Sequence, residues 1–127
     1  MSSRLTELMH AIDVAWNARR WDDYMALISP DFRGYMNGDT EPHGKEEHLR
    51  RGKAFCEEYP DNRIANDPYL VLFEDAEQGR TCSIAITTGT HTSGKPLRAT
   101  LAVICLWRNG QIAEQREFIV TDPFPAT

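Results

Sequence analysis

Glu117, Arg116, Tyr35 and Asn37 carry side chains that could move a proton or hold a substrate oxygen. A carboxylate in an apolar cavity loses hydration, so its pKa rises and it becomes a better proton carrier near neutral pH. A buried phenol or amide needs a hydrogen-bond partner, which a bound water, a substrate oxygen or a nearby loop would supply. These residues can act together only where the fold brings them to one cavity.

The four histidines and three cysteines of the sequence do not form a recognisable metal site. No two histidines show metal-ligand spacing with a third group, so we predict no metal. The cysteines are odd in number and lie in apolar contexts, which indicates buried thiols in a reducing cytosol. Glycine-rich phosphate loops and nucleophile elbows are missing, and we expect no cofactor.

Charge and length restrict the possible partners. The chain of 127 residues has a formal net charge of −5, and no run of Lys and Arg exceeds two residues. A nucleic-acid surface would need a basic stripe, so we expect no nucleic-acid partner. The absence of an apolar signal core and of a transmembrane run predicts a cytoplasmic protein without a membrane partner. The length predicts one domain over residues 1–127.

Periodicity predicts three helices and five strands. The helices are expected up to about residue 18, with Ser2 or Ser3 as N-cap, and over 21–28 and 45–59. The strands are expected over 32–36, 63–74, 80–91, 97–107 and 111–121, with Pro68 marking an edge or a bulge. This order, α-α-β-α-β-β-β-β, predicts an α+β fold.

Two turns set the expected pairing of the last three strands. Asn109-Gly110 is typical of a two-residue type I′ hairpin, and Ser93-Gly94 is read in the same way. The more apolar sheet face is then the core face, with Arg116 pointing inward and Glu117 outward. A β-bulge near Glu117 would reverse this orientation, so either residue could face the cavity.

The same pairing assigns further side chains to the two faces. Cys82 and Cys105 lie opposite each other on the apolar face, so both are expected to stay reduced and to react slowly. The predicted core face carries Cys82, Ile84, Ile86, Leu101, Val103, Cys105, Trp107, Ile112 and Phe118, together with Glu114 and Arg116. The predicted outer face carries Ser83, Ala85, Thr87, Thr100, Ala102, Ile104, Gln115 and Glu117.

Three segments, taken with the element order, resemble one family over nearly the whole chain. They are Trp16-Asn17 through Ser29-Pro30-Asp31-Phe32, then Tyr35-Met36-Asn37 followed by His43-Gly44, and finally residues 110–118. They resemble the SnoaL-like branch of the nuclear transport factor 2-like superfamily. The resemblance implies a cone in which three helices pack on a strongly curved, mostly antiparallel sheet around an apolar pocket for a small molecule.

The resemblance also implies roles for individual residues. Glu117 would be the acid/base group, Tyr35 and Asn37 would hold an oxygen or a water, and Arg116 would stabilise negative charge. The residues expected to contact the substrate are Trp16, Tyr24, His43, Phe55, Tyr59 and Phe118. Members commonly dimerise through the outer sheet face, and the small residues Ser83, Ala85 and Ala102 would permit such a homodimer.

Two functions therefore remain open. The first is an enzyme that performs cyclisation, isomerisation or hydration on a small apolar carbonyl compound without a cofactor. The second is a ligand-binding or assembly domain without chemistry. The uncharged stretch from Cys82 to Thr87 favours the second, because limonene epoxide hydrolases carry charged residues there; the Tyr35, Asn37 and Glu117 set favours the first.

Overall fold

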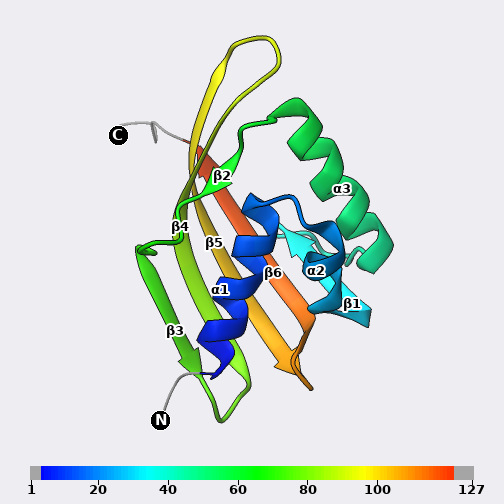
Figure 1. The fold of residues 1–127 in the computed structure, drawn as a ribbon. Helices are drawn as coiled ribbons and strands as arrows, with labels where there is room; N and C mark the ends of the chain where they lie inside the picture. Colours follow the sequence, from blue (N-terminus) through cyan, green and yellow to red (C-terminus); the bar gives the residue numbers. More distant parts are fainter. Residues whose placement is uncertain (1–3, 122–127) are drawn as a thin grey trace.

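The computed structural model describes residues 4–121, which form three helices and a six-stranded sheet (Figure 1). The helices are α1 (Arg4–Asn17), α2 (Trp21–Ala26) and α3 (Lys45–Glu58). The strands are β1 (Ile28–Met36), β2 (Arg63–Ile64), β3 (Val71–Asp75), β4 (Arg80–Thr90), β5 (Pro96–Arg108) and β6 (Gln111–Thr121). Ser2 and Ser3, the predicted caps, lie outside the described residues.

The sheet is curved and mixed, and the helices cover its concave face (Figure 1). The strand order is β1-β6-β5-β4-β2, and β3 also pairs with β4. Only the pair of β1 with β6 is parallel among these strands. The predicted α+β class and the curved, mostly antiparallel sheet are therefore confirmed.

Helix α1 packs on the sheet through a narrow apolar stripe. Met9, Ile12 and Ala15 recur every three residues and are buried in the main core. Helix α3 approaches α1 closely at Gly52, where a Cβ atom would lie 3.0 Å from the Trp16 ring. No helix within residues 4–121 is long and apolar enough to cross a bilayer.

Three elements differ from their expected bounds: the second helix, the first strand, which begins at Ile28 and not at Phe32, and the strand expected over 63–74. The second helix ends at Ala26, because the fully buried Ile28 already pairs with Ile112 and begins β1. The strand expected over 63–74 is split into β2 and β3 by residues 65–70. This gap contains Pro68, which cannot donate a hydrogen bond to a sheet ladder.

The hairpin between β5 and β6 contains the turn expected from the sequence and one extra residue. Asn109 and Gly110 have φ angles of 53° and 77°, as a type I′ turn requires. Beyond the turn, Ala113 is the extra residue in β6, since the pairing shifts by one between Leu106 and Trp107. This bulge is the device that could reverse the facing of the residues that follow it.

The hairpin between β4 and β5 is longer than predicted. Thr90 pairs with Pro96, so residues 91–95 form the loop and Ser93-Gly94 is not a two-residue turn. The register consequently moves by one residue, and Ala85 pairs with Leu101 instead of Ala102. A slip of one residue reverses the face of every side chain in a strand.

The register of the β4–β5 hairpin therefore makes the predicted faces of β4 wrong. In β6 the faces after Ala113 follow the alternative with a β-bulge, so that Glu117 and not Arg116 points to the concave side. Thr81, Ser83, Ala85 and Thr87 are buried on the concave side. Cys82, Ile84 and Ile86 alternate with them and lie on the outer side, as do Phe118 and Val120, which are about 40% exposed. The faces of Leu101, Val103, Cys105 and Trp107 agree with the prediction. Ser83 and Ala85 cannot form the predicted outer dimer surface.

We predict that Cys105 reacts with iodoacetamide only when the domain unfolds, whereas Cys82 reacts in the folded state. Cys105 is completely buried, and Cys82 is half-buried on the outer face. Burial raises the pKa of both thiols and keeps thiolate scarce, so exposure decides which of them reacts first. Peptide mass spectrometry over time measures both rates. Equal rates for the two cysteines would contradict the observed register.

Candidate functional site

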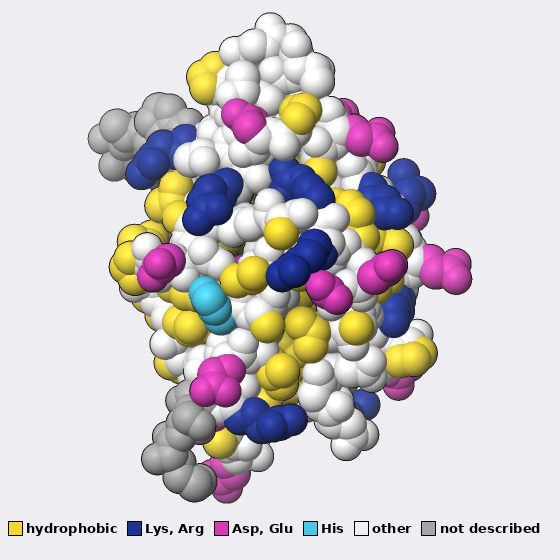
Figure 2. Space-filling view, in the orientation of Figure 1, with side chains coloured by type: hydrophobic (Ala, Val, Ile, Leu, Met, Phe, Trp, Pro, Cys, Tyr) yellow, Lys and Arg dark blue, Asp and Glu magenta, His cyan; other side chains and the backbone are white. Residues whose placement is uncertain are grey.

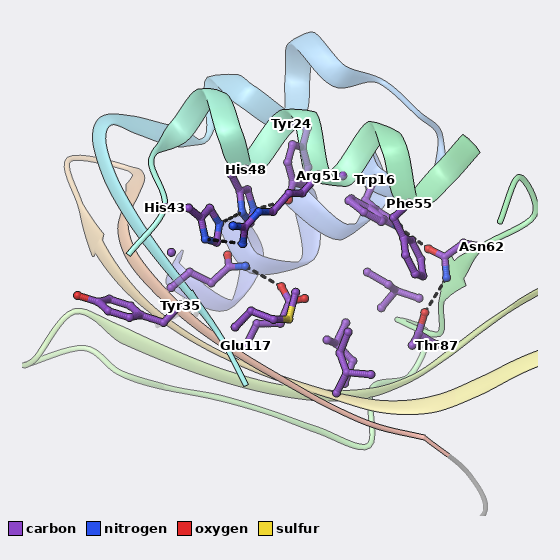
Figure 3. Close-up of a pocket in the computed structure, with 17 residues that line it drawn as sticks. Trp16, Tyr24, Tyr35, His43, His48, Arg51, Phe55, Asn62, Thr87 and Glu117 are labelled. Carbon is purple, nitrogen blue, oxygen red and sulfur yellow. Dashed lines mark hydrogen bonds between the residues drawn. The ribbon is translucent and has the colours of Figure 1, made fainter. Parts of the chain in front are cut away.

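A largely apolar cavity of ≈ 260 Å³ lies between the concave face of the sheet and the helices (Figure 3). Trp16 from α1 and Phe55 from α3 form part of its helical wall, and Leu101 and Ile119 form part of its floor. Such a cavity suits a small organic molecule with few polar groups.

Among residues 4–121, Glu117 is the acidic residue that lines this cavity. Its pairing with Val103 places it on the concave face, in agreement with the bulge at Ala113. Burial raises the pKa of Glu117 to about 7, although the hydrogen bond from Gln115 acts in the opposite direction. A carboxyl group with a pKa near neutrality can both take and return a proton under ordinary conditions.

The Glu117 carboxylate is held by a short chain of hydrogen bonds along the strands. The amide nitrogen of Gln115 donates to Oε1 of Glu117 at 3.0 Å. The Cys105 thiol donates to the amide oxygen of Gln115 at 3.7 Å. Because Gln115 and Cys105 are paired residues on adjacent strands, the sheet itself orients the carboxylate.

A second buried carboxyl, Asp13 of α1, lies behind the cavity. With Glu117 and Tyr24 it lines a smaller adjoining void of ≈ 60 Å³. The Tyr69 hydroxyl donates to Oδ2 of Asp13 at 2.6 Å. Burial raises the pKa of Asp13 to about 7 despite this hydrogen bond. The charge of Asp13 also contributes to the raised pKa of Glu117.

A polar cluster lies at one end of the cavity and consists of His48 and Arg51 from α3, Tyr24 from α2, and His43, which precedes α3 (Figure 3). Nη1 of Arg51 lies 3.2 Å from Nδ1 of His43, and Nε2 of His43 lies 2.8 Å from Nδ1 of His48. Nε2 of His48 lies 3.0 Å from the Tyr24 hydroxyl. The rings of His43 and His48 are nearly coplanar, at an interplanar angle of 10°, which allows a hydrogen bond in the ring planes.

Asn62 lines the opposite end of the cavity, and its side-chain amide makes all of its hydrogen bonds to the protein (Figure 3). The Trp16 indole donates to Oδ1 of Asn62 at 2.8 Å. The Asn62 amide nitrogen donates to the Thr87 hydroxyl at 2.8 Å and to the Thr88 carbonyl at 2.9 Å. Both N–H groups of the Asn62 amide are used within the protein, so Asn62 cannot donate to a ligand and we assign it a structural role in the cavity wall.

Tyr35 and Asn37 lie differently from what the resemblance implied. Tyr35 contributes to the cavity rim, but its ring points away from the cavity and lies 4.1 Å from the Arg116 guanidinium (Figure 3). Asn37 is exposed and does not line the cavity. Its side-chain oxygen accepts a hydrogen bond from the Ile119 amide at 2.9 Å, which ties β1 to β6.

The remaining predicted site residues fall into two groups. Trp16, Tyr24, His43 and Phe55 line the cavity. The others do not: Arg116 and Phe118 lie on the outer face, and Tyr59 stacks on Phe55 at 4.8 Å outside the lining. Within residues 4–121, the cation that lines the cavity is therefore Arg51 and not Arg116.

The sequence reasoning missed His48, Arg51, Gln115 and Asp13 as residues of the site. The spacing of His48, Arg51 and Phe55 along α3 was a usable signal, because residues three and four apart share a helix face. Asp13 sits within the apolar stripe of α1, and an acidic residue there is unusual enough to suggest a buried partner.

Two findings bear on the expected partners. Within the described residues, no three His, Cys, Asp or Glu side chains are grouped closely enough to hold a metal ion. Figure 2 shows acidic and basic side chains interspersed on the face viewed in Figure 1, so no stripe of one charge gathers on that face.

A sequence model of the SnoaL-like polyketide cyclase family matches residues 6–120. The match spans most of the chain, and the chain belongs to this family. No protein with curated annotation matches it significantly.

Several solved structures share this fold at low sequence identity. AclR, a proposed hydroxylase from Streptomyces galilaeus, is 16% identical with a TM-score of 0.80, over 94% of this chain and 80% of AclR. IdmH, a proposed polyketide cyclase from Streptomyces antibioticus, is 18% identical with a TM-score of 0.78, over 94% and 93%. A proposed polyketide cyclase from Pseudomonas putida is 20% identical with a TM-score of 0.78, over 91% of each chain.

We predict that Asp13→Asn stabilises the protein above neutral pH and has no effect at pH 4 or below. The pKa of Asp13 is raised from 3.8 to about 7, so the folded state holds a proton that the unfolded chain releases. Stability therefore falls as pH rises from about 4 to 7, by up to about 4 kcal/mol for this group. Asn still accepts from Tyr69 but does not titrate.

Urea unfolding of both proteins between pH 4 and pH 8 measures this difference. Glu74→Gln is a control that also replaces a carboxylate near α1, because Glu74 accepts a hydrogen bond from the Thr6 amide at the far end of this helix. It should leave the loss of stability between pH 4 and pH 8 in place. Curves for the wild type and Asp13→Asn that stay parallel across this range would refute the raised pKa.

Proposed function

We propose that this SnoaL-like domain is an enzyme that uses acid/base chemistry, without a cofactor, on a small and mainly apolar carbonyl compound. Glu117 would take a proton from the carbon beside the carbonyl group. The resulting enolate would attack a second carbonyl in a cyclisation, or regain a proton at another carbon in an isomerisation. In a hydration the same carboxylate would take a proton from water.

One observation supports this proposal above the others: the Glu117 carboxylate faces a largely apolar cavity and has a pKa raised to about 7. A carboxylate costs free energy in such a place, and structural roles rarely require one. Gln115 orients the carboxylate but neutralises no charge, so the group keeps its basicity. The family and the polyketide cyclases among the structural neighbours are compatible with this chemistry.

The cavity lining points to the class of substrate. Aromatic and aliphatic side chains dominate it, and its polar groups lie mainly at the end formed by His48, Arg51 and Glu117. A ligand would place its oxygen atoms at that end and its hydrocarbon part against Trp16 and Phe55. A polyketide-like or terpenoid-like carbonyl compound has this division.

The second candidate function is a binding or assembly domain without chemistry. The inner residues of β4, Thr81, Ser83, Ala85 and Thr87, are uncharged, so this strand supplies no second charged group to the cavity. The outer sheet face exposes large apolar side chains suited to assembly, including Phe73, Ile104 and Phe118.

The cytoplasmic location remains a prediction, with which the three free cysteines agree.

We predict that Glu117→Gln lowers turnover by roughly 10²–10⁴-fold while folding and ligand affinity stay nearly unchanged. Glutamine keeps the size of the side chain and its hydrogen bonding but cannot exchange a proton near neutral pH. A test that needs no natural substrate is exchange of the α-protons of 1-tetralone in D₂O, followed by proton NMR. The wild type should accelerate this exchange.

Glu114→Gln is the matched control for this experiment. Glu114 precedes Glu117 by three residues and pairs with Arg33 at 3.3 Å at the surface, so its loss should leave exchange unaffected. A wild-type protein that binds 1-tetralone without accelerating exchange would favour the binding domain. Undiminished exchange in Glu117→Gln would remove Glu117 from the chemistry.

We further propose a homodimer formed through the outer sheet face, now based on its exposed apolar residues Val71, Phe73, Ile104, Phe118 and Val120. Light scattering should give about twice the chain mass of 14.5 kDa at micromolar concentration. Phe73→Ser with Phe118→Ser should yield monomers, and Cys82 should react more slowly as the wild-type protein is concentrated. A wild-type mass near that of one chain would contradict the proposal.

A further inference from the structure

Arg51, His43, His48 and Tyr24 form a series of hydrogen bonds, here called the hydrogen-bond chain, in which the donors can point in one direction only. A guanidinium group only donates, so Nδ1 of His43 must accept from Arg51. A neutral His43 then carries its proton on Nε2 and donates to Nδ1 of His48. His48 in turn carries its proton on Nε2, which points at the oxygen of Tyr24.

Both imidazole rings are held in the neutral state that this direction requires. Burial above all, together with the neighbouring His43 and Arg51, lowers the pKa of His48 to about 4. Burial and the Arg51 charge also lower the pKa of His43. Each ring therefore has one proton near neutral pH, and Arg51 decides on which nitrogen it lies.

Because the hydrogen-bond chain ends with His48 donating to the Tyr24 oxygen, the proton of the Tyr24 hydroxyl has no acceptor within this chain. Its oxygen accepts from His48, which is its one hydrogen-bond partner within residues 4–121. Tyr24 lines the cavity together with Glu117. Burial, and then the charge of Glu117, raise the pKa of Tyr24 well above its usual value, so the hydroxyl keeps its proton and stays a donor.

We propose that Tyr24 donates a hydrogen bond to the carbonyl oxygen of the substrate, and that Arg51, His43 and His48 are positioning residues that direct this donor into the cavity. The proposal rests on the proposed function. When Glu117 takes the α-proton, negative charge develops on that oxygen, and a preorganised donor in an apolar cavity stabilises it. The charge of Arg51 polarises the whole chain towards the cavity.

The surrounding residues hold the chain in place. Glu47 accepts from Nε of Arg51 at 2.9 Å and fixes the guanidinium one helical turn away. Phe32 packs on the His48 ring at a centroid distance of 4.7 Å. Gly34 leaves the space that His43 occupies, since a Cβ atom there would lie 2.5 Å from Nε2 of His43. Gly34 is therefore a further positioning residue.

The positions of the ring protons can be measured without any ligand. In the double variant His10→Gln/His91→Gln, the pair His43 and His48 supplies all histidine signals, because the chain has four histidines. Nitrogen NMR at about pH 7 should show both rings neutral with the proton on Nε2. In Arg51→Met the His43 ring should lose this single tautomer. A His48 ring protonated on Nδ1, or on both nitrogens, would overturn the proposal.

The donor itself can be tested with 4-nitrophenol, whose phenolate resembles an enolate and has its own absorption band. Glu117→Gln serves as the parent protein, since it lacks the charge that would repel a phenolate. Adding Tyr24→Phe should reduce the affinity for phenolate relative to phenol by roughly tenfold or more. A parent protein without phenolate preference, or an unchanged ratio in Tyr24→Phe, would overturn the proposal.

Two further variants separate positioning from packing. His48→Leu should lower the same ratio, whereas His48→Gln should retain much of it, because the amide can accept from His43 and donate to Tyr24. His91→Leu is the matched control at the β4–β5 hairpin, where His91 contacts Ser93, and it should change nothing. Equal losses in His48→Leu and His48→Gln would contradict the role of the ring proton.

The two proposals can fail separately. If Glu117→Gln retained full exchange activity, the proposed function would fail while the tautomers and the phenolate preference remained as described. If His48 carried its proton on Nδ1, it would not donate to Tyr24, and the proposed role of the Tyr24 hydroxyl as a donor would fail. The role of Glu117 would be unaffected.

Discussion

The position of one extra residue in β6 determines which side chains enter the cavity. Without the bulge at Ala113, the two-residue turn at Asn109-Gly110 would place Arg116 on the concave face and Glu117 outside. With it, Gln115 and Glu117 face inward together. The bulge thus brings a carboxylate into apolar surroundings, and the raised pKa, the shared hydrogen bond with Gln115 and the electrostatic contact with Asp13 all follow from that burial.

The sequence was sufficient for the three helices, the fold class and the β5–β6 turn, because each depends on local periodicity or on positive φ angles. One strand was predicted over 63–74, where the structure has β2 and β3. The faces of β4 could not be obtained from the sequence. We assumed that the more apolar side of a strand faces the core, yet β4 buries Thr81 and Thr87 and exposes Ile84 partly to the outside. The buried hydroxyls are satisfied by Trp107 and Asn62, which lie 26 and 25 residues away.

In the site as well, residues could be predicted where their role depends on neighbours in the sequence. They were missed where it depends on contacts with distant segments. Glu117 was predicted as a candidate from the sequence. The side of the sheet to which it points depends on the bulge at Ala113, and no residue at that position indicates a bulge. Tyr35 and Asn37 matched a motif, but the ring of Tyr35 lies beside Arg116 and the Asn37 side chain joins two strands. His48 and Arg51 become meaningful only when α3 is placed over β1. Asp13 gains its partner Tyr69 from 56 residues away.

Gly34 has a consequence for altering substrate size. Because His43 fills the space that a side chain at position 34 would need, β1 and the segment that leads into α3 lie close together at that end of the cavity. Variants with a wider or narrower cavity are therefore better sought at the other end, where Phe55 lies near Asn62 and Thr87 (Figure 3). Diversification of this domain for new ligands should start from that wall and leave the histidine end untouched.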